Sequence, residues 1–160
     1  MLRNPKRHVI FLKRLNILQT VVSGLISQQT GVWHTWDLDA PIEERYAGLR
    51  PLSIDFVRGG VADVAEEIEH FESVVRSRPG PSLVLTYEEL YLGTPDERRE
   101  VICRAFAFLG LEPPPFEATD QVTDPTRTRL NSARTYALLP NARELDAALG
   151  SEATGKLFED

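Results

Sequence analysis

The sequence predicts an α/β fold in which a small parallel sheet is flanked by helices. Two short runs of β-prone apolar residues, 8–13 and 82–86, alternate with stretches whose apolar residues have the period of a helix. The first run is continuously apolar from Val9 to Leu12, which is typical of a strand buried on both faces of a parallel sheet. With 160 residues, of which 42% are hydrophobic and 26% charged, the chain fits a single domain over residues 1–160.

The first half of the chain has signals for three helices. Asn16 is a good N-cap for the first one, and Gly31 is expected to end it. The apolar residues of this helix predict a stripe that faces the core: Leu18, Val21, Val22, Leu25 and Ile26. A short helix is expected at 42–47, and Ser53 is expected to cap a long helix that runs to about Ser77.

The second half begins with a strong break at Arg78-Pro-Gly-Pro, before the second strand. Pro95 is placed for the first turn of a helix that Gly110 would end. Residues 117–129 have the composition of a polar loop. Asn141 is expected to cap a last helix through Leu149, and residues 151–158 to add another turn or two.

Charge and composition exclude several classes of function. A net charge of -6 argues against a general nucleic-acid binder, whose surface is basic. Cys103 is the single cysteine, so the sequence predicts no disulfide framework and no cysteine metal site, and no histidine pair has metal-ligand spacing. No apolar run approaches the roughly 20 residues of a transmembrane helix, and the run after the basic start is too short for a signal peptide. A cytoplasmic protein without a metal is therefore expected.

The junction of the first strand and the first helix is the main candidate for ligand binding. Arg14 follows the strand, at the edge where α/β folds hold their ligands, and its planar guanidinium suits phosphate. Ser23 lies two turns into the expected helix, on the face that carries Asn16. An anion held by Arg14 could therefore reach the Ser23 hydroxyl. The alternative is an arginine in a salt bridge and a serine that faces solvent.

Two segments carry a resemblance to a known family. The strand, Arg14-Leu-Asn16, Val22-Ser23 and the T-G-x-W of 30–33 together resemble the 3′-phosphate-binding segment of the sulfotransferase superfamily, in its bacterial and carbohydrate-type members. The segment SLVLTYEELYLGTPDERREVICRAFAFLGL, 82–111, is similar to the family's strand, its Y-E-[DE]-L, a helix and F-L-G-L. Residues 130–145 resemble the family's C-terminal stretch more weakly, so the resemblance covers nearly the whole chain.

This resemblance implies a P-loop-like sulfotransferase fold and a nucleotide donor. The reaction would transfer a sulfuryl group from 3′-phosphoadenosine 5′-phosphosulfate to a hydroxyl of a small-molecule, carbohydrate or lipid acceptor. Arg14 and Ser23 would hold the 3′-phosphate, and Tyr87 would lie near the adenine, unless it is a half-buried core tyrosine. Arg127 and Arg129 would help to close the nucleotide site from a basic loop, unless that loop is only solvated.

Three further residues near these segments are open to two interpretations. Arg134 would join the basic loop of the nucleotide site or belong to the same solvated surface. His34, between Trp33 and Trp36, could act as a general base if its pKa were shifted by desolvation. The resemblance instead favours a packing role for Trp33. No residue is assigned as the catalytic base.

The family's 5′-phosphosulfate loop has no counterpart in the sequence. No G-x-x-x-x-G-K-[ST] occurs, and the basic start has no glycine-rich turn. The expectation is a domain that lacks the N-terminal phosphosulfate-loop unit, either as the C-terminal part of a longer enzyme or as a shortened relative without activity. The alternative function is a non-catalytic binding or assembly module derived from that fold, whose sheet edge a partner or a homodimer would cover. Whether the chain is an enzyme is left open.

Overall fold

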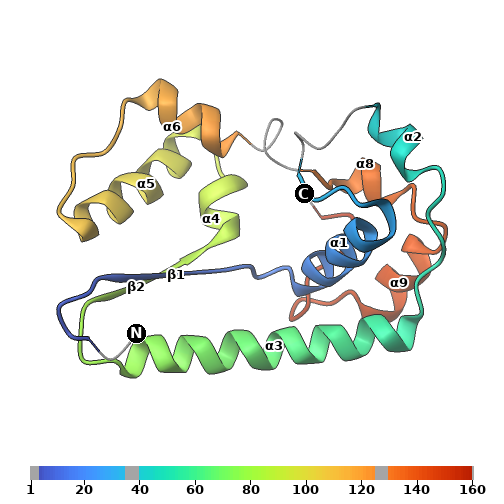
Figure 1. Cartoon of the computed structure of the whole chain (residues 1–160), viewed down its shortest axis with the longest axis horizontal. Coiled ribbons are helices and arrows are strands. Elements are labelled where there is room, and N and C mark those ends of the chain that lie inside the picture. Colours follow the sequence, from blue (N-terminus) through green and yellow to red (C-terminus); the bar gives the residue numbers. More distant parts are fainter. Residues whose placement is uncertain (1–3, 35–39, 125–129, 160) are drawn as a thin grey trace. The chain divides into compact units, whose positions relative to one another are not determined.

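The computed structural model describes residues 4–34, 40–124 and 130–159 (Figure 1). Its two strands are β1 (Val9–Lys13) and β2 (Ser82–Thr86). Its helices are α1 (Ile17–Thr30), α2 (Ile42–Tyr46), α3 (Ile54–Ser77), α4 (Tyr87–Tyr91), α5 (Pro95–Leu109), α6 (Phe116–Thr123), α8 (Ala133–Tyr136) and α9 (Ala142–Leu149). In the described residues no helix is long and apolar enough to cross a membrane.

The two strands form the small parallel sheet that the sequence predicts. They lie side by side in Figure 1, in a register that pairs Val9 with Ser82 and Lys13 with Thr86. The sheet is flanked by helices, so the mixed α/β class is confirmed. The expected burial of β1 on both faces is wrong, because Ile10 is 36% exposed and Leu12 is 46% exposed. The strand alternates instead, since a two-stranded sheet offers little to cover its second face.

The chain divides into two compact units, and each consists of two separate segments. Unit 1 contains residues 1–14 and 66–128, and unit 2 contains residues 15–65 and 129–160. The helix α3 contributes its first half to unit 2 and its second half to unit 1. The single domain expected over residues 1–160 stays a prediction.

Unit 2 is built around the predicted stripe of α1. Asn16 caps this helix by accepting a hydrogen bond from the backbone N–H of Gln19 at 2.9 Å. Gly31 ends it in the left-handed conformation, with a φ of 74°, as a glycine can without strain. The buried cluster around this stripe contains Leu18, Val22, Ile26, Tyr46, Leu49, Val57, Val61, Tyr136, Leu139, Ala142, Leu145 and Leu157.

Unit 1 is organised around α5, which contacts both α4 and α6 (Figure 1). Thr94 and Glu97 form a capping box at its start, with Pro95 in the first turn. Gly110 ends the helix with a φ of 71°. The predicted bounds of α5 are therefore confirmed.

The polar loop predicted for 117–129 is wrong over its first part, because α6 covers Phe116–Thr123. The sequence of α6 has no clear apolar stripe, and the helix is held against α5 largely by contacts of charged side chains. Arg98 donates to Asp120 at 2.7 Å, and the Arg99 guanidinium lies over the Phe116 ring at 5.4 Å. The rest of the predicted loop, 125–129, lies outside the described residues.

The C-terminal stretch also departs from the prediction. Asn141 precedes α9 but does not cap it with its side chain, which instead exchanges hydrogen bonds with the backbone N–H and carbonyl of Leu52 at 3.0 and 2.8 Å. Residues 151–158 add no helix. They form a turn that is closed by a bridge between Ser151 and Gly155.

Candidate functional site

Arg14 and Tyr87 meet at the carboxyl ends of the two strands, within unit 1. The parallel register pairs Lys13 with Thr86, so the residues that follow emerge at the same edge of the sheet. The guanidinium carbon of Arg14 lies 4.7 Å from the centroid of the Tyr87 ring. This is a cation–π contact, in which the guanidinium stays charged and presents its donors in one plane.

The capping of α4 holds the Tyr87 ring in place. The backbone N–H of Glu89 donates to the Thr86 hydroxyl at 3.1 Å, and the Thr86 N–H donates to the Glu89 carboxylate at 2.9 Å. Tyr91, one turn later, stacks on Tyr87 with ring centroids 4.6 Å apart and 30° between the planes. Burial, and then the neighbouring Tyr87, raise the pKa of Tyr91. The two rings therefore form a fixed apolar surface beside Arg14.

The expected stacking of adenine on Tyr87 stays a prediction. Arg14 and Tyr91 already contact this ring, so an adenine would have to share it or displace one of them. Lys13, the neighbour of Arg14 in sequence, is paired with Glu72 at 2.5 Å. Hydrogen bonds from Lys13 and then from Arg76 lower the pKa of Glu72, so this carboxylate is ionised at neutral pH.

Ser23 lies in unit 2, on α1. Its Oγ is 2.6 Å from the hydroxyl oxygen of Tyr136, a fully buried residue of α8. Ser23 is half-buried, so it is not the solvent-facing serine of the alternative interpretation. Arg14 belongs to the other unit, and the shared 3′-phosphate contact of Arg14 and Ser23 stays a prediction.

Of the other predicted site residues, some lie within the described residues and some do not. Arg127, Arg129 and Trp36 lie outside the described residues. Arg134 has a largely exposed side chain that forms an ion pair with Glu43, as expected of a solvated surface. The pKa of Glu43 is lowered, first by a backbone hydrogen bond and then by Arg134.

Trp33 and His34 both lie in exposed positions. Trp33 is 55% exposed and so is only partly packed, and the packing role favoured for it stays a prediction. His34 is exposed as well, so its side chain is not desolvated.

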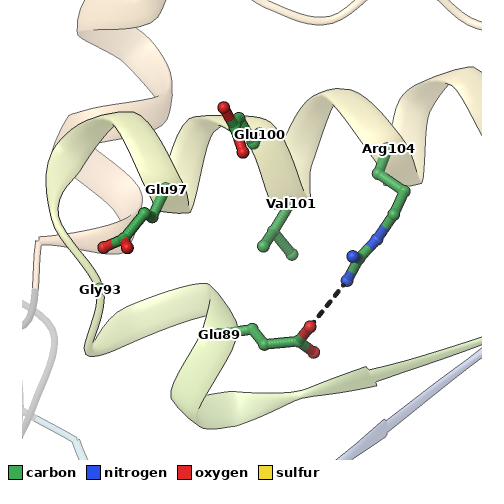
Figure 2. Close-up of a pocket in the computed structure, with 6 residues that line it drawn as sticks. All are labelled: Glu89, Gly93, Glu97, Glu100, Val101 and Arg104. Atoms are coloured by element: carbon green, nitrogen blue, oxygen red, sulfur yellow. Dashed lines mark hydrogen bonds and ion pairs between the residues drawn. The ribbon is translucent and has the colours of Figure 1, made fainter.

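A separate cavity of about 540 Å³ lies between α4 and α5 in unit 1 (Figure 2). It is lined by Glu89, Gly93, Glu97, Glu100, Val101 and Arg104, and Arg104 donates to Glu89 at 3.1 Å. Backbone hydrogen bonds from Thr86 and Thr94 are the largest causes that lower the pKa values of Glu89 and Glu97, respectively. Three glutamates around one arginine disfavour an anionic nucleotide.

Sequence reasoning did not identify this cavity, and the only signal was the paired T-x-x-E of two capping boxes. Among the described residues, no group of three or more histidine, cysteine or acidic side chains is placed to hold a metal ion.

Comparison with known proteins gives no match. No family model, no curated protein and no solved structure matches the chain. The resemblance to sulfotransferases therefore stays a prediction from the sequence motifs quoted above.

Proposed function

We propose that this chain is a domain with the P-loop-like sulfotransferase fold, and that it binds 3′-phosphoadenosine 5′-phosphosulfate as a sulfuryl donor. The observation that carries the proposal is the contact of Arg14 with Tyr87. These residues belong to the two segments with the family resemblance, and the parallel pairing of β1 and β2 brings them to one edge of the sheet.

The chemistry of the two side chains supports a phosphate ligand. A guanidinium that is stacked on an aromatic ring keeps its charge and can donate two parallel hydrogen bonds to phosphate oxygens. The sequence resemblance adds Ser23, Arg127 and Arg129 as further candidate ligands of the nucleotide.

In the proposed reaction the acceptor hydroxyl oxygen attacks the donor sulfur. The bond from sulfur to the bridging phosphate oxygen breaks, 3′-phosphoadenosine 5′-phosphate leaves, and a base takes the hydroxyl proton. The acceptor is a small molecule, a carbohydrate or a lipid. We assign no residue of this chain as that base.

A non-catalytic binding or assembly module of the same fold is the second candidate. One observation favours it: Ile10 and Leu12 of β1 are partly exposed, and a partner or a second copy of the chain could cover them. Sulfuryl transfer from labelled donor by the purified 160-residue chain would exclude this candidate. Binding of the nucleotide without transfer would support it.

Calorimetric titration with 3′-phosphoadenosine 5′-phosphate tests the site. Loss of a charge-assisted hydrogen bond costs about 1.5–3 kcal/mol, so Arg14→Ala is expected to weaken binding by about 10- to 100-fold. Adenosine 5′-phosphate, which lacks the 3′-phosphate, should bind both proteins equally.

Arg99→Ala is the matched control, because it removes an arginine from another cation–π pair of unit 1, the one with Phe116. This variant should bind the nucleotide like the unaltered chain. Absence of binding by the unaltered chain, or equal affinities for Arg14→Ala and Arg99→Ala, would contradict the proposal.

A further inference from the structure

The strand β1 has an edge that no other strand of the described residues covers. The Val9 N–H donates to the Pro81 carbonyl at 3.2 Å, and in a parallel ladder alternate residues bond the same neighbour. The odd-numbered residues of β1 therefore face β2, and the backbone N–H and carbonyl groups of Ile10 and Leu12 point away from it. Within the described residues these groups have no hydrogen-bond partner, and we call them the free edge of β1.

The apolar face beside this edge is covered over β2 and open over β1. Leu12 pairs with Leu85 in the register, so the two side chains lie on the same face of the sheet. Leu85 is 3% exposed, whereas Leu12 is 46% exposed. The helix α5 lies over this face, where the Phe108 ring meets the His8 ring with centroids 5.1 Å apart. A further strand next to β1 would cover the side chains that α5 leaves exposed.

The charges at the two ends of β1 determine which strand fits there. Lys6 and Arg7 precede the strand with exposed side chains, and no carboxylate of the described residues forms an ion pair with either of them. Lys13 and Arg14 follow at the other end, where Glu72 neutralises Lys13 and Arg14 keeps its charge. An apolar strand with positive charge at its ends is complementary to a strand with acidic ends.

A second copy of β1 does not have this complementarity. A symmetric antiparallel pairing of two copies around Ile10 places Arg7 opposite Lys13 and Lys6 opposite Arg14. Like charges that face each other across two strands destabilise the pairing. The basic ends therefore disfavour association between copies of the chain and favour a partner of the opposite charge.

We propose that the free edge of β1 binds an extended acidic segment of a partner protein, which adds a third strand to the sheet. The backbone of this segment bonds the N–H and carbonyl groups of Ile10 and Leu12, and its alternate apolar side chains cover these two residues. Its acidic ends meet the cations that flank β1. Binding at this edge does not require the nucleotide, so failure of either proposal leaves the other in place.

A synthetic peptide tests this binding, with alternating valine and threonine residues between two aspartates at each end. Calorimetric titration of the whole 160-residue chain should detect binding that weakens as the salt concentration rises. The same peptide with lysine in place of aspartate should bind at least about 10-fold more weakly. The backbone amides of Ile10 and Leu12 should exchange hydrogen more slowly when the aspartate peptide is bound.

N-methylation of the peptide distinguishes strand pairing from simple adhesion. Methylation of the alternate amides that face β1 should abolish binding, and methylation of the other alternate set should leave it intact. Ile10→Pro should also abolish binding, because it removes an N–H of the free edge that the ladder to β2 does not use. If Ile10→Pro does not fold, the two methylated peptides decide the question with the unaltered chain.

Charge reversal tests the acidic character of the partner. Lys6→Glu combined with Arg7→Glu should weaken binding of the aspartate peptide about 5- to 20-fold and should strengthen binding of the lysine peptide. Arg50→Glu combined with Arg143→Glu is the matched control, because it changes the net charge equally at exposed positions of unit 2. This control should bind both peptides like the unaltered chain.

Four results would overturn the proposal. The first is no binding of the aspartate peptide at about 1 mM. The second is equal affinity for the aspartate and lysine peptides, and the third is equal affinity for the two methylated peptides. The fourth is a dimer of the unaltered chain that Ile10→Pro dissociates, because a second copy would then occupy the edge.

Discussion

Replacement of Gln19 by glutamate should unfold unit 2 at a lower temperature. Gln19 is 1% exposed, and its amide nitrogen donates to the carbonyl oxygens of Lys156, Leu157 and Glu159 at 3.1, 3.3 and 2.8 Å. This side chain therefore ties the end of the chain to α1. Gln19→Glu keeps the shape but turns a donor into a negative charge that faces carbonyl oxygens.

The magnitude follows from the cost of a buried charge without a partner. Such a charge destabilises by about 3–5 kcal/mol, a large share of the roughly 5–15 kcal/mol that stabilise a typical domain. At about 2–4 °C per kcal/mol for a chain of this size, the unfolding midpoint should fall by about 6–20 °C at pH 7.

The loss should be smaller in acid. The carbonyl oxygens raise the pKa of the introduced carboxyl group above the value of about 4.3 that it has in the unfolded chain. Between these two values the folded state binds more protons, so stability falls as the pH rises through this window. The difference from the unaltered chain should therefore shrink between pH 7 and pH 4.

Tryptophan fluorescence during heating is a suitable assay, because both tryptophans lie in the sequence of unit 2. Gln29→Glu is the matched control on the same helix, since Gln29 bonds Arg50 in an exposed position, and its cost should stay below about 1 kcal/mol. Equal midpoints for the two variants, or a difference that does not depend on pH, would refute the reasoning.

Two further predictions concern the same unit. Gly155 has a φ of 75°, and a Cβ there would collide with the capping side chain of Asn16, whereas Gly31 has a φ of 74° with nothing within 4 Å of its Cβ position. Gly155→Ala should therefore lower the free energy of unfolding, measured in urea, by about 2–4 kcal/mol, and Gly31→Ala should lower it by about 1–2 kcal/mol. Equal losses for the two variants would show that the contact with Asn16 adds nothing to the cost. Burial, and then Tyr136, raise the pKa of Tyr46 to about 12. Since the unfolded chain loses this proton near pH 10, stability should fall between about pH 10 and 12, and less so in Tyr46→Phe, as urea midpoints along a pH series would report.

The sequence was sufficient for the elements whose signals are local. Asn16 caps α1 and Gly31 ends it, and Pro95 and Gly110 bound α5, because caps depend on a few adjacent residues. The pairing of the two strands was also predictable, since β-prone runs on either side of helices form parallel sheets.

Elements that depend on partners distant in sequence could not be predicted. The helix α6 is held by Arg98 and Arg99 of α5, so its own apolar pattern is weak. The exposure of Ile10 depends on which elements cover the second face of the sheet. The apolar run of β1 does not indicate whether such elements are present.

The candidate site was predictable to the same extent. Arg14 and Tyr87 follow paired strands, so their meeting is a consequence of register. The partner of Ser23 is Tyr136, which is 113 positions away, and no spacing rule connects them. The exposed surroundings of Trp33 could not be predicted either, because they depend on the fold of the whole unit.

The interleaving of the two units has a consequence for how the protein is made. A ribosome delivers the chain from its N-terminus, so β1 emerges long before Ser82 and the rest of its partner strand. The hydrogen bond from the Gln19 amide to the Glu159 carbonyl likewise cannot form until Glu159, 140 positions later, has been added. Neither unit can close around its core until its second segment has been synthesised. The apolar residues of β1 and α1 thus remain uncovered until these later segments have been made, a period in which a chaperone would protect them from aggregation.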